Sequence, residues 1–221
     1  EDEEAQSEWP VVRLSTNALS ALALCRLARH GDAAPFDAPL GGLARYLLSQ
    51  YQEGTGFVGE RKLLSTMPGS QADRTDGGIA VCAMVALYEK TDERVFWTVA
   101  IEAFRAMLPG AGKTPMGRLA TDEWFLRAAD VCFTYSREPQ CVVQAQRYAL
   151  GLVAQQDRHP VFPDMFGSVR RLPSATVSAS QTGLIAIAAR LAYDGGQKAA
   201  GREMLAESRS SLVAQLQGYM T

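Results

Sequence analysis

Apolar positions recur every three to four residues along almost the whole chain, and an alternating period of two is nearly absent. A period near 3.6 residues is typical of α-helices with a buried face. The pattern therefore predicts an all-α fold, with helices over residues 15–29, 40–51, 76–90, 93–108, 122–135, 139–156, 174–193 and 197–217. No convincing strand is predicted, because the runs 56–58 and 161–162 are too short to seed a sheet.

The predicted helices differ in how much of their surface is apolar. The third and seventh are apolar on nearly all faces, the first and fifth less clearly so, and the even-numbered helices carry a charged face. A helix that is apolar all round is buried, and one with a charged face lies outside. Connections after odd-numbered helices are short and those after even-numbered helices are long, so each odd helix should pair with its successor. We therefore expect an array of about four antiparallel helical hairpins, with inner and outer helices.

Polar residues open the apolar inner helices. The pairs at these positions are Thr16-Asn17, Asp76-Gly77, Asp122-Glu123 and Ser180-Gln181. If the inner helices run parallel, these pairs and the long connections gather at one end of the array. Polar groups beneath long connections are typical of a ligand site. The sequence thus predicts a site at the N-terminal rim of the inner helices.

Three carboxylates at this rim are candidate catalytic residues: Asp76, Asp122 and Glu123. Glycoside hydrolysis generally uses two carboxyl groups across the scissile bond, one as acid and one as base or nucleophile. Aspartate at a helix start is also the expected N-cap, whose oxygen accepts a backbone N–H. A capping role therefore remains open for Asp76 and Asp122, whereas Glu123 is less easily explained as a cap.

Aromatic and cationic residues near the rim are candidate ligand contacts. Trp124 could stack on a sugar face, and Arg127, one turn later, could bind a carboxylate through two hydrogen bonds. Equally, Trp124 could belong to the core and Arg127 could extend its stem along apolar surface. The other candidates lie in long connections or at an inner-helix start: Phe57, His159, Phe162, Arg170, Arg171 and Gln181. The adjacent arginines fit either recognition of an acidic sugar or a solvated surface.

Several short motifs resemble those of the α/α-toroid superfamily, in which helical hairpins form a ring around a funnel. They are Glu53-Gly54-Thr55-Gly56-Phe57, Asp76-Gly77-Gly78, Leu87-Tyr88-Glu89-Lys90-Thr91-Asp92-Glu93 and Asp122-Glu123-Trp124. The resemblance is to six-hairpin glycosidase-like and N-acylglucosamine epimerase-like members, and the smaller number of hairpins here indicates an incomplete ring. It implies a hydrolase, lyase or epimerase that acts on a polysaccharide or acidic sugar. The alternative is a non-catalytic helical-repeat domain that binds a protein or glycan partner in an envelope or secretion assembly.

Charge and composition narrow the classes of function. Twenty-two basic residues against twenty-four acidic ones give a net charge of −2, so the chain lacks the basic footprint of nucleic-acid binding. No apolar run approaches the ~20 residues of a membrane span. With two histidines and four scattered cysteines, neither a metal site nor a cofactor is expected. The sequence also lacks a GxGxxG or P-loop motif.

The organisation of the chain is expected to be simple. Residues 1–10 predict an acidic flexible tail and residues 11–221 a single domain, with a further flanking domain possible in the full protein. The cysteines lie in or at the start of apolar runs, which favours buried free thiols over one or two disulfides. The absence of an initiator methionine and the polysaccharide analogy favour a periplasmic or extracellular location, and a cytoplasmic one stays open.

Overall fold

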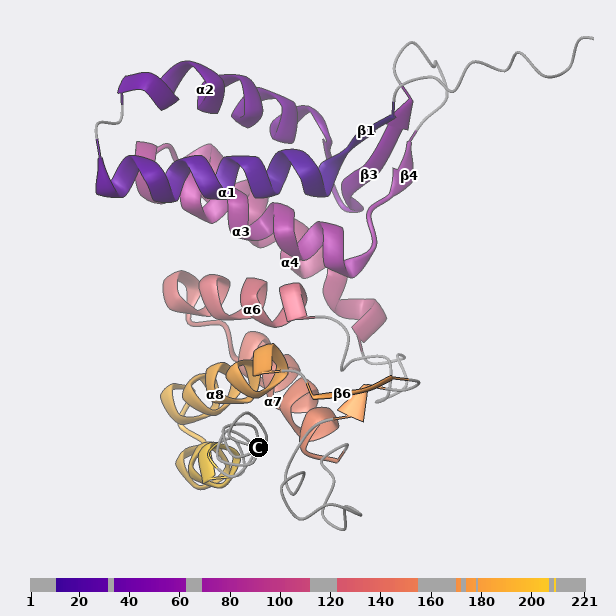
Figure 1. Cartoon of the computed structure of the whole chain (residues 1–221), viewed down its shortest axis with the longest axis vertical. Helices are drawn as coiled ribbons and strands as arrows, with labels where there is room; N and C mark the ends of the chain where they lie inside the picture. Colours follow the sequence, from indigo (N-terminus) through magenta and orange to yellow (C-terminus); the bar gives the residue numbers. More distant parts are fainter. Residues whose placement is uncertain are drawn as a thin grey trace, which may run out of the picture. The chain divides into compact units, whose positions relative to one another are not determined.

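The structure is a computed structural model, and it describes residues 11–31, 34–62, 69–111, 123–154, 170–171, 174–177, 179–206 and 209. The described part is mainly helical, which confirms the all-α prediction (Figure 1). The chain forms two compact units, Glu1–Met107 and Leu108–Thr221. A single domain and an incomplete toroid stay predictions, and the predicted tail over residues 1–10 lies outside the described residues.

Four helices of the first unit follow the predicted order. They are α1 (Leu14–His30), α2 (Ala34–Ser49), α3 (Arg74–Thr91) and α4 (Arg94–Ala111). The largest difference is at α2, which begins six residues before its predicted start at residue 40. Pro39, which precedes the predicted start, lies inside this helix. Helix α1 packs against both α2 and α3.

A small antiparallel sheet accompanies these helices, and the prediction that the chain has no strand is wrong here. Its strands are β1 (Val11–Arg13), β2 (Tyr51–Gln52), β3 (Gly56–Lys62) and β4 (Ser70–Gln71). Strand β3 pairs with each of the other three, and its far end pairs with β1 through Val12 and Arg61. The run that looked too short is therefore stabilised by strands on both sides, one of them distant in sequence.

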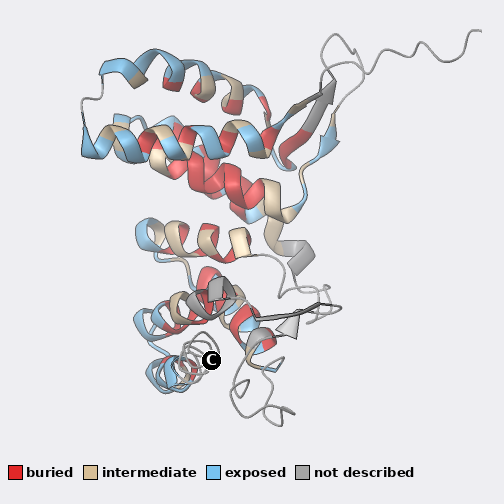
Figure 2. Cartoon of the chain, in the orientation of Figure 1, coloured by how far each residue is buried: buried red, intermediate tan, exposed pale blue. Residues whose placement is uncertain are grey.

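Helix α3 forms the centre of the first unit. Every residue over 77–85 is buried, so all faces of the helix are covered over more than two turns. In Figure 2, α3 is buried over most of its length, while α1 and α2 expose their outer sides. The prediction of a buried third helix is confirmed. Helix α1 buries a single stripe instead, and its Leu27 is 54% exposed.

The described residues of the second unit form helices and a two-stranded ladder. The elements are α6 (Glu123–Ser136), α7 (Pro139–Val153), β5 (Arg170–Arg171), β6 (Ser174–Val177) and α8 (Ala179–Asp194). Helix α6 packs against α7 and α8, and α7 packs against α8. A helical segment follows at 198–206. The prediction that the seventh helix begins at residue 174 is wrong, because residues 174–177 form a strand paired with β5.

The turns that follow α3 and α6 share one construction. The Thr91 hydroxyl accepts the backbone N–H of Glu93 at 3.2 Å, and the Ser136 hydroxyl accepts that of Glu138 at 3.2 Å. Each hydroxyl also donates to the carbonyl four residues earlier in its helix. The residue between them is left-handed in both turns: Asp92 (φ 59°) and Arg137 (φ 58°). The same local chemistry thus ends two helices that the sequence places at equivalent positions of a repeat.

Ion pairs link helices within each unit. Arg29, at the end of α1, pairs with Glu89 near the end of α3, so these two helices run in the same direction. In the second unit, Arg190 of α8 pairs with Asp130 of α6. Exposed pairs of this kind contribute at most about 1 kcal/mol each, so apolar packing carries most of the stability.

All four cysteines are free and buried, which agrees with the prediction of buried thiols. They are Cys25, Cys82, Cys132 and Cys141, and none is more than 6% exposed. Burial also raises the pKa of the Cys25 thiol, which disfavours the reactive thiolate. We therefore expect the native chain to react slowly with a disulfide reagent such as DTNB, and the chain in guanidinium to show four reactive thiols. Rapid labelling of the native chain would contradict this packing.

Candidate functional site at the start of helix α6

The structure brings together two of the predicted ligand contacts at the start of α6. Trp124 and Arg127 are three residues apart and therefore lie on one side of the helix. The Arg127 guanidinium carbon lies 5.5 Å from the centroid of the Trp124 ring. Both residues are half-buried, so neither is fully withdrawn from solvent. Glu123, the first residue of α6, is also half-buried beside them.

Arg127 has unused hydrogen-bonding capacity. Its Nε atom is buried, and no described group accepts a hydrogen bond from it. A buried donor without an acceptor costs about 1–3 kcal/mol. The guanidinium carbon lies over the Trp124 ring, and the residue is half-buried, so the side chain keeps some contact with solvent. A guanidinium can bind an acceptor with two oxygens, such as a carboxylate, through two hydrogen bonds.

Asp130 continues the same ridge of α6 and contacts α8. Its side chain is 19% exposed and accepts a hydrogen bond from the Arg190 guanidinium. Burial raises the pKa of Asp130, the charges of Arg190 and Arg127 lower it, and Asp194 raises it. The net direction is upward, so loss of solvation outweighs the two arginines. Asp130 and Arg190 were not among the predicted site residues, and we interpret their pair first as a link between the two helices.

Two of the predicted catalytic carboxylates belong to different units, and their action in one site stays a prediction. Asp76 is half-buried at the third residue of α3, in the first unit, whereas Glu123 belongs to the second. The expected N-cap role of Asp76 is wrong, because the cap is Asp73, whose carboxylate accepts the Asp76 backbone N–H at 2.8 Å. At this position in the first turn, an acidic side chain is stabilised by the helix dipole. Asp122 lies outside the described residues.

The remaining predicted contacts have varied positions. Phe57 is only 3% exposed and packs edge-on against Tyr51 at 5.8 Å, so its ring belongs to the core of the first unit. Arg170 and Arg171 form strand β5, and Gln181 lies in the first turn of α8. His159 and Phe162 lie outside the described residues. Among the described residues, no three His, Cys, Asp or Glu side chains are placed to hold a metal ion.

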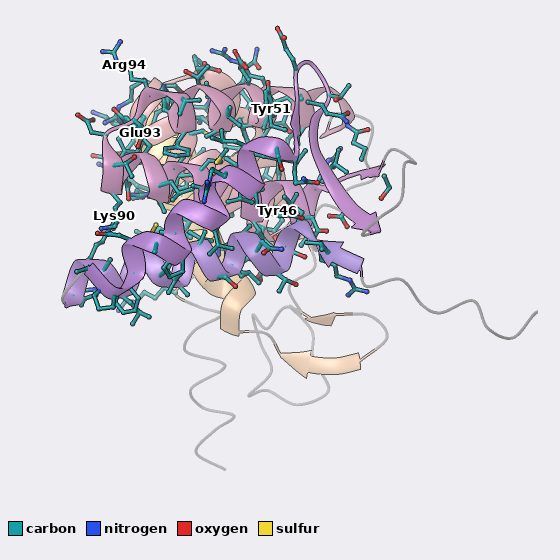
Figure 3. The ribbon with its side chains drawn as sticks, turned by 90° about the horizontal axis from the view of Figure 1, so that it is seen from above. Tyr46, Tyr51, Lys90, Glu93 and Arg94 are labelled. Carbon is teal, nitrogen blue, oxygen red and sulfur yellow. The ribbon has the colours of Figure 1, made fainter. Side chains whose placement is uncertain are left out.

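Tyr51, in the first unit, loses its phenolic proton less readily than an ordinary tyrosine does. Tyr51 donates to Glu102 at 2.8 Å, and Figure 3 shows Tyr51 toward the sheet end of this unit, away from Lys90. Burial, followed by the hydrogen bond and charge of Glu102 and the charge of Glu53, raises the pKa of Tyr51 from 10.0 to about 12. Between these values the native state retains a proton that the unfolded chain has lost. The resulting stability is present below pH 10 and is lost as the pH rises through about 12.

We expect an absorbance titration of tyrosinate to show a late-ionising component that Tyr51→Phe reduces by one tyrosine. Glu102→Gln should shift that ionisation to lower pH, because it removes the carboxylate charge that opposes the phenolate. Tyr135→Phe, at a residue that is 43% exposed, is the matched control and should leave the late step intact. A late component whose amplitude Tyr51→Phe leaves unchanged would contradict the assignment.

Comparison with known proteins adds no family to this description. Neither the protein families, nor the curated proteins, nor the solved structures include a match to the chain. Over the described residues, no helix has the length and apolarity needed to cross a membrane.

Proposed function

We propose that the chain is a carbohydrate-active protein that recognises an acidic sugar at the start of α6, and that it acts on this sugar or its polysaccharide as a hydrolase, lyase or epimerase. The observation that carries the proposal is the Arg127 guanidinium, which lies over Trp124 with a buried Nε that has no described acceptor. A uronate carboxylate would supply that acceptor, and an indole offers apolar surface to the C–H face of a sugar ring.

The catalytic part of the proposal depends on neighbouring carboxylates. Glu123 lies one turn before Arg127, which places both on the same side of α6. Asp122 directly precedes Glu123 in the sequence. One of the two would act as general acid and the other as base or nucleophile, the division of roles that sugar hydrolysis requires.

Binding can be tested separately from turnover. Isothermal titration should show that uronate oligosaccharides bind more tightly than neutral oligosaccharides of the same length. Arg127→Gln should weaken uronate binding about ten- to a hundredfold, because a charge-assisted hydrogen bond is lost. Arg147→Gln is the matched control, since Arg147 is an exposed arginine of α7. Equal binding of neutral and acidic sugars, or unchanged binding by Arg127→Gln, would contradict the proposal.

The alternative is a non-catalytic helical domain that binds a glycan or protein partner. One observation favours it: Asp73 and Asp76 at the start of α3 are accounted for by helix capping and the helix dipole. Asp122→Asn and Glu123→Gln distinguish the two functions. Loss of turnover with retained uronate binding would support an enzyme, whereas retained binding by a wild-type chain that converts no sugar would support the binding domain.

A further inference from the structure

A second candidate site lies in the second unit, between α8 and the helical segment 198–206. It is a groove of ≈ 270 Å³ that opens to solvent, and its surface is almost entirely apolar. Helix α8 contributes Ala186 and Tyr193, and the following segment contributes Leu205. Tyr193 and Leu205 are 42% and 54% exposed, so large apolar side chains border the groove and remain in contact with water.

The groove exists because a glycine allows the two helices to approach closely. A Cβ atom on Gly201 would lie 2.7 Å from the Ala189 carbonyl oxygen and 3.0 Å from the Tyr193 Cβ. Both contacts are shorter than side chains normally tolerate, so the local spacing requires glycine. The small side chain of Ala186 then leaves space beside this contact.

The charged residues that line the groove are basic. Among the residues that the structure describes, they are Arg190 and Arg202, and none is acidic. Because the lining is apolar, the two arginines contribute their aliphatic stems to the groove and hold their guanidinium groups at its rim. Arg190 is already paired with Asp130, whereas no ion pair involves Arg202 within the described part of the chain. Arg202 is therefore the cation available to an incoming anion.

Three further charged residues lie near the groove in space or in sequence. Lys198 places its Nζ 5.8 Å from the ring centroid of Tyr193, which adds positive charge on the Tyr193 side. The acidic residues adjacent in sequence, Asp194 and Glu203, are exposed and do not line the groove.

We propose that this groove binds a single-chain alkyl carboxylate, with the chain between α8 and segment 198–206 and the carboxylate paired with Arg202. The groove exceeds the cavity of about 150 Å³ that accommodates benzene, yet it is below the usual range for larger ligands. Its apolar surface offers a sugar no hydrogen bonds, so the site differs in chemistry from the one at α6. An amphipathic partner helix would need an apolar strip longer than the two turns of α8 that line the groove.

The test is binding of decanoate to the full chain, measured by isothermal titration below the micelle concentration. We expect saturable binding, with decan-1-ol at least about tenfold weaker because it lacks the charge for Arg202. Arg202→Gln should weaken decanoate binding about tenfold or more and leave decan-1-ol binding unchanged. Ala186→Phe should abolish binding of both, since the new ring fills the groove from a half-buried position on α8.

Controls separate this site from general effects and from the α6 site. Arg209→Gln changes an exposed arginine that does not line the groove, and it should bind decanoate as the wild type does. Arg127→Gln should also leave decanoate binding unchanged. The proposal is overturned by an absence of saturable binding, by binding that survives Ala186→Phe, or by an acidic amphipathic peptide that binds the groove where decanoate does not.

Discussion

Phe104→Ala lowers the free energy of unfolding by about 3–5 kcal/mol, the largest stability effect that we expect from a single substitution in the first unit. Phe104 is fully buried on α4. Its ring is among the largest side chains in this core, and alanine would leave a cavity that the close-packed neighbours cannot fill. Urea denaturation followed by circular dichroism should show a lower midpoint with little change in the m-value.

The matched control for this prediction lies on the same helix. Val95 is 45% exposed near the start of α4, and Val95→Ala should change the free energy of unfolding by no more than about 0.5 kcal/mol. A cost at Phe104 below about 1 kcal/mol, or an equal cost at Val95, would mean that α4 does not bury this face.

Local patterns were sufficient to predict the helices of the chain. The apolar period and the short polar turns place α3 and α4 within three residues of their observed ends. The turn at Thr91 shows why: a hydroxyl and a following left-handed residue end the helix through contacts within a few residues. Such signals are local, so they can be recognised without knowing the tertiary structure.

The strands could not be predicted in the same way, because their partners are distant. Val12 pairs with Arg61 across about fifty residues of sequence, and the charged end of β3 has no strand-like pattern of its own. Strand β6 was easier to predict from the sequence. Thr176 and Val177 are β-branched and follow Pro173, features that favour an extended strand over a helix start. The continuous apolar run into α8 masks that signal, because it extends the helical pattern back toward residue 174.

The candidate site shows the same limit. The spacing of Trp124 and Arg127 places them together on α6, so their proximity could be predicted from the sequence. Asp130 could not be linked to Arg190, because sixty residues separate the two and only the packing of α6 on α8 joins them. The N-cap was misplaced by three residues, since Asp73 and Asp76 are equally plausible caps until the first helical residue is known.

Gly201→Ala is expected to destabilise the second unit by about 1–3 kcal/mol, although alanine is the better helix former. In an exposed helix this substitution would stabilise by up to about 1 kcal/mol, because glycine has the greater backbone freedom to lose. At this position the added Cβ meets the Ala189 carbonyl oxygen at 2.7 Å, and a backbone atom cannot rotate away as a side chain can. Packing therefore predicts that Gly201→Ala lowers the free energy of unfolding, whereas helix propensity predicts that it raises it.

Thermal unfolding and amide hydrogen exchange can distinguish these opposing effects. Gly201→Ala should lower the unfolding temperature and speed exchange over residues 198–206, while exchange over α3 in the other unit stays unchanged. Ala199→Gly, at an exposed position of the same segment, is the control for propensity and should cost about 0.5–1 kcal/mol. Both the loss of a glycine and the gain of one would then destabilise one short helix. A stabilised Gly201→Ala variant would show that the segment does not pack closely on α8, and the groove proposed beside Gly201 would lose its structural basis.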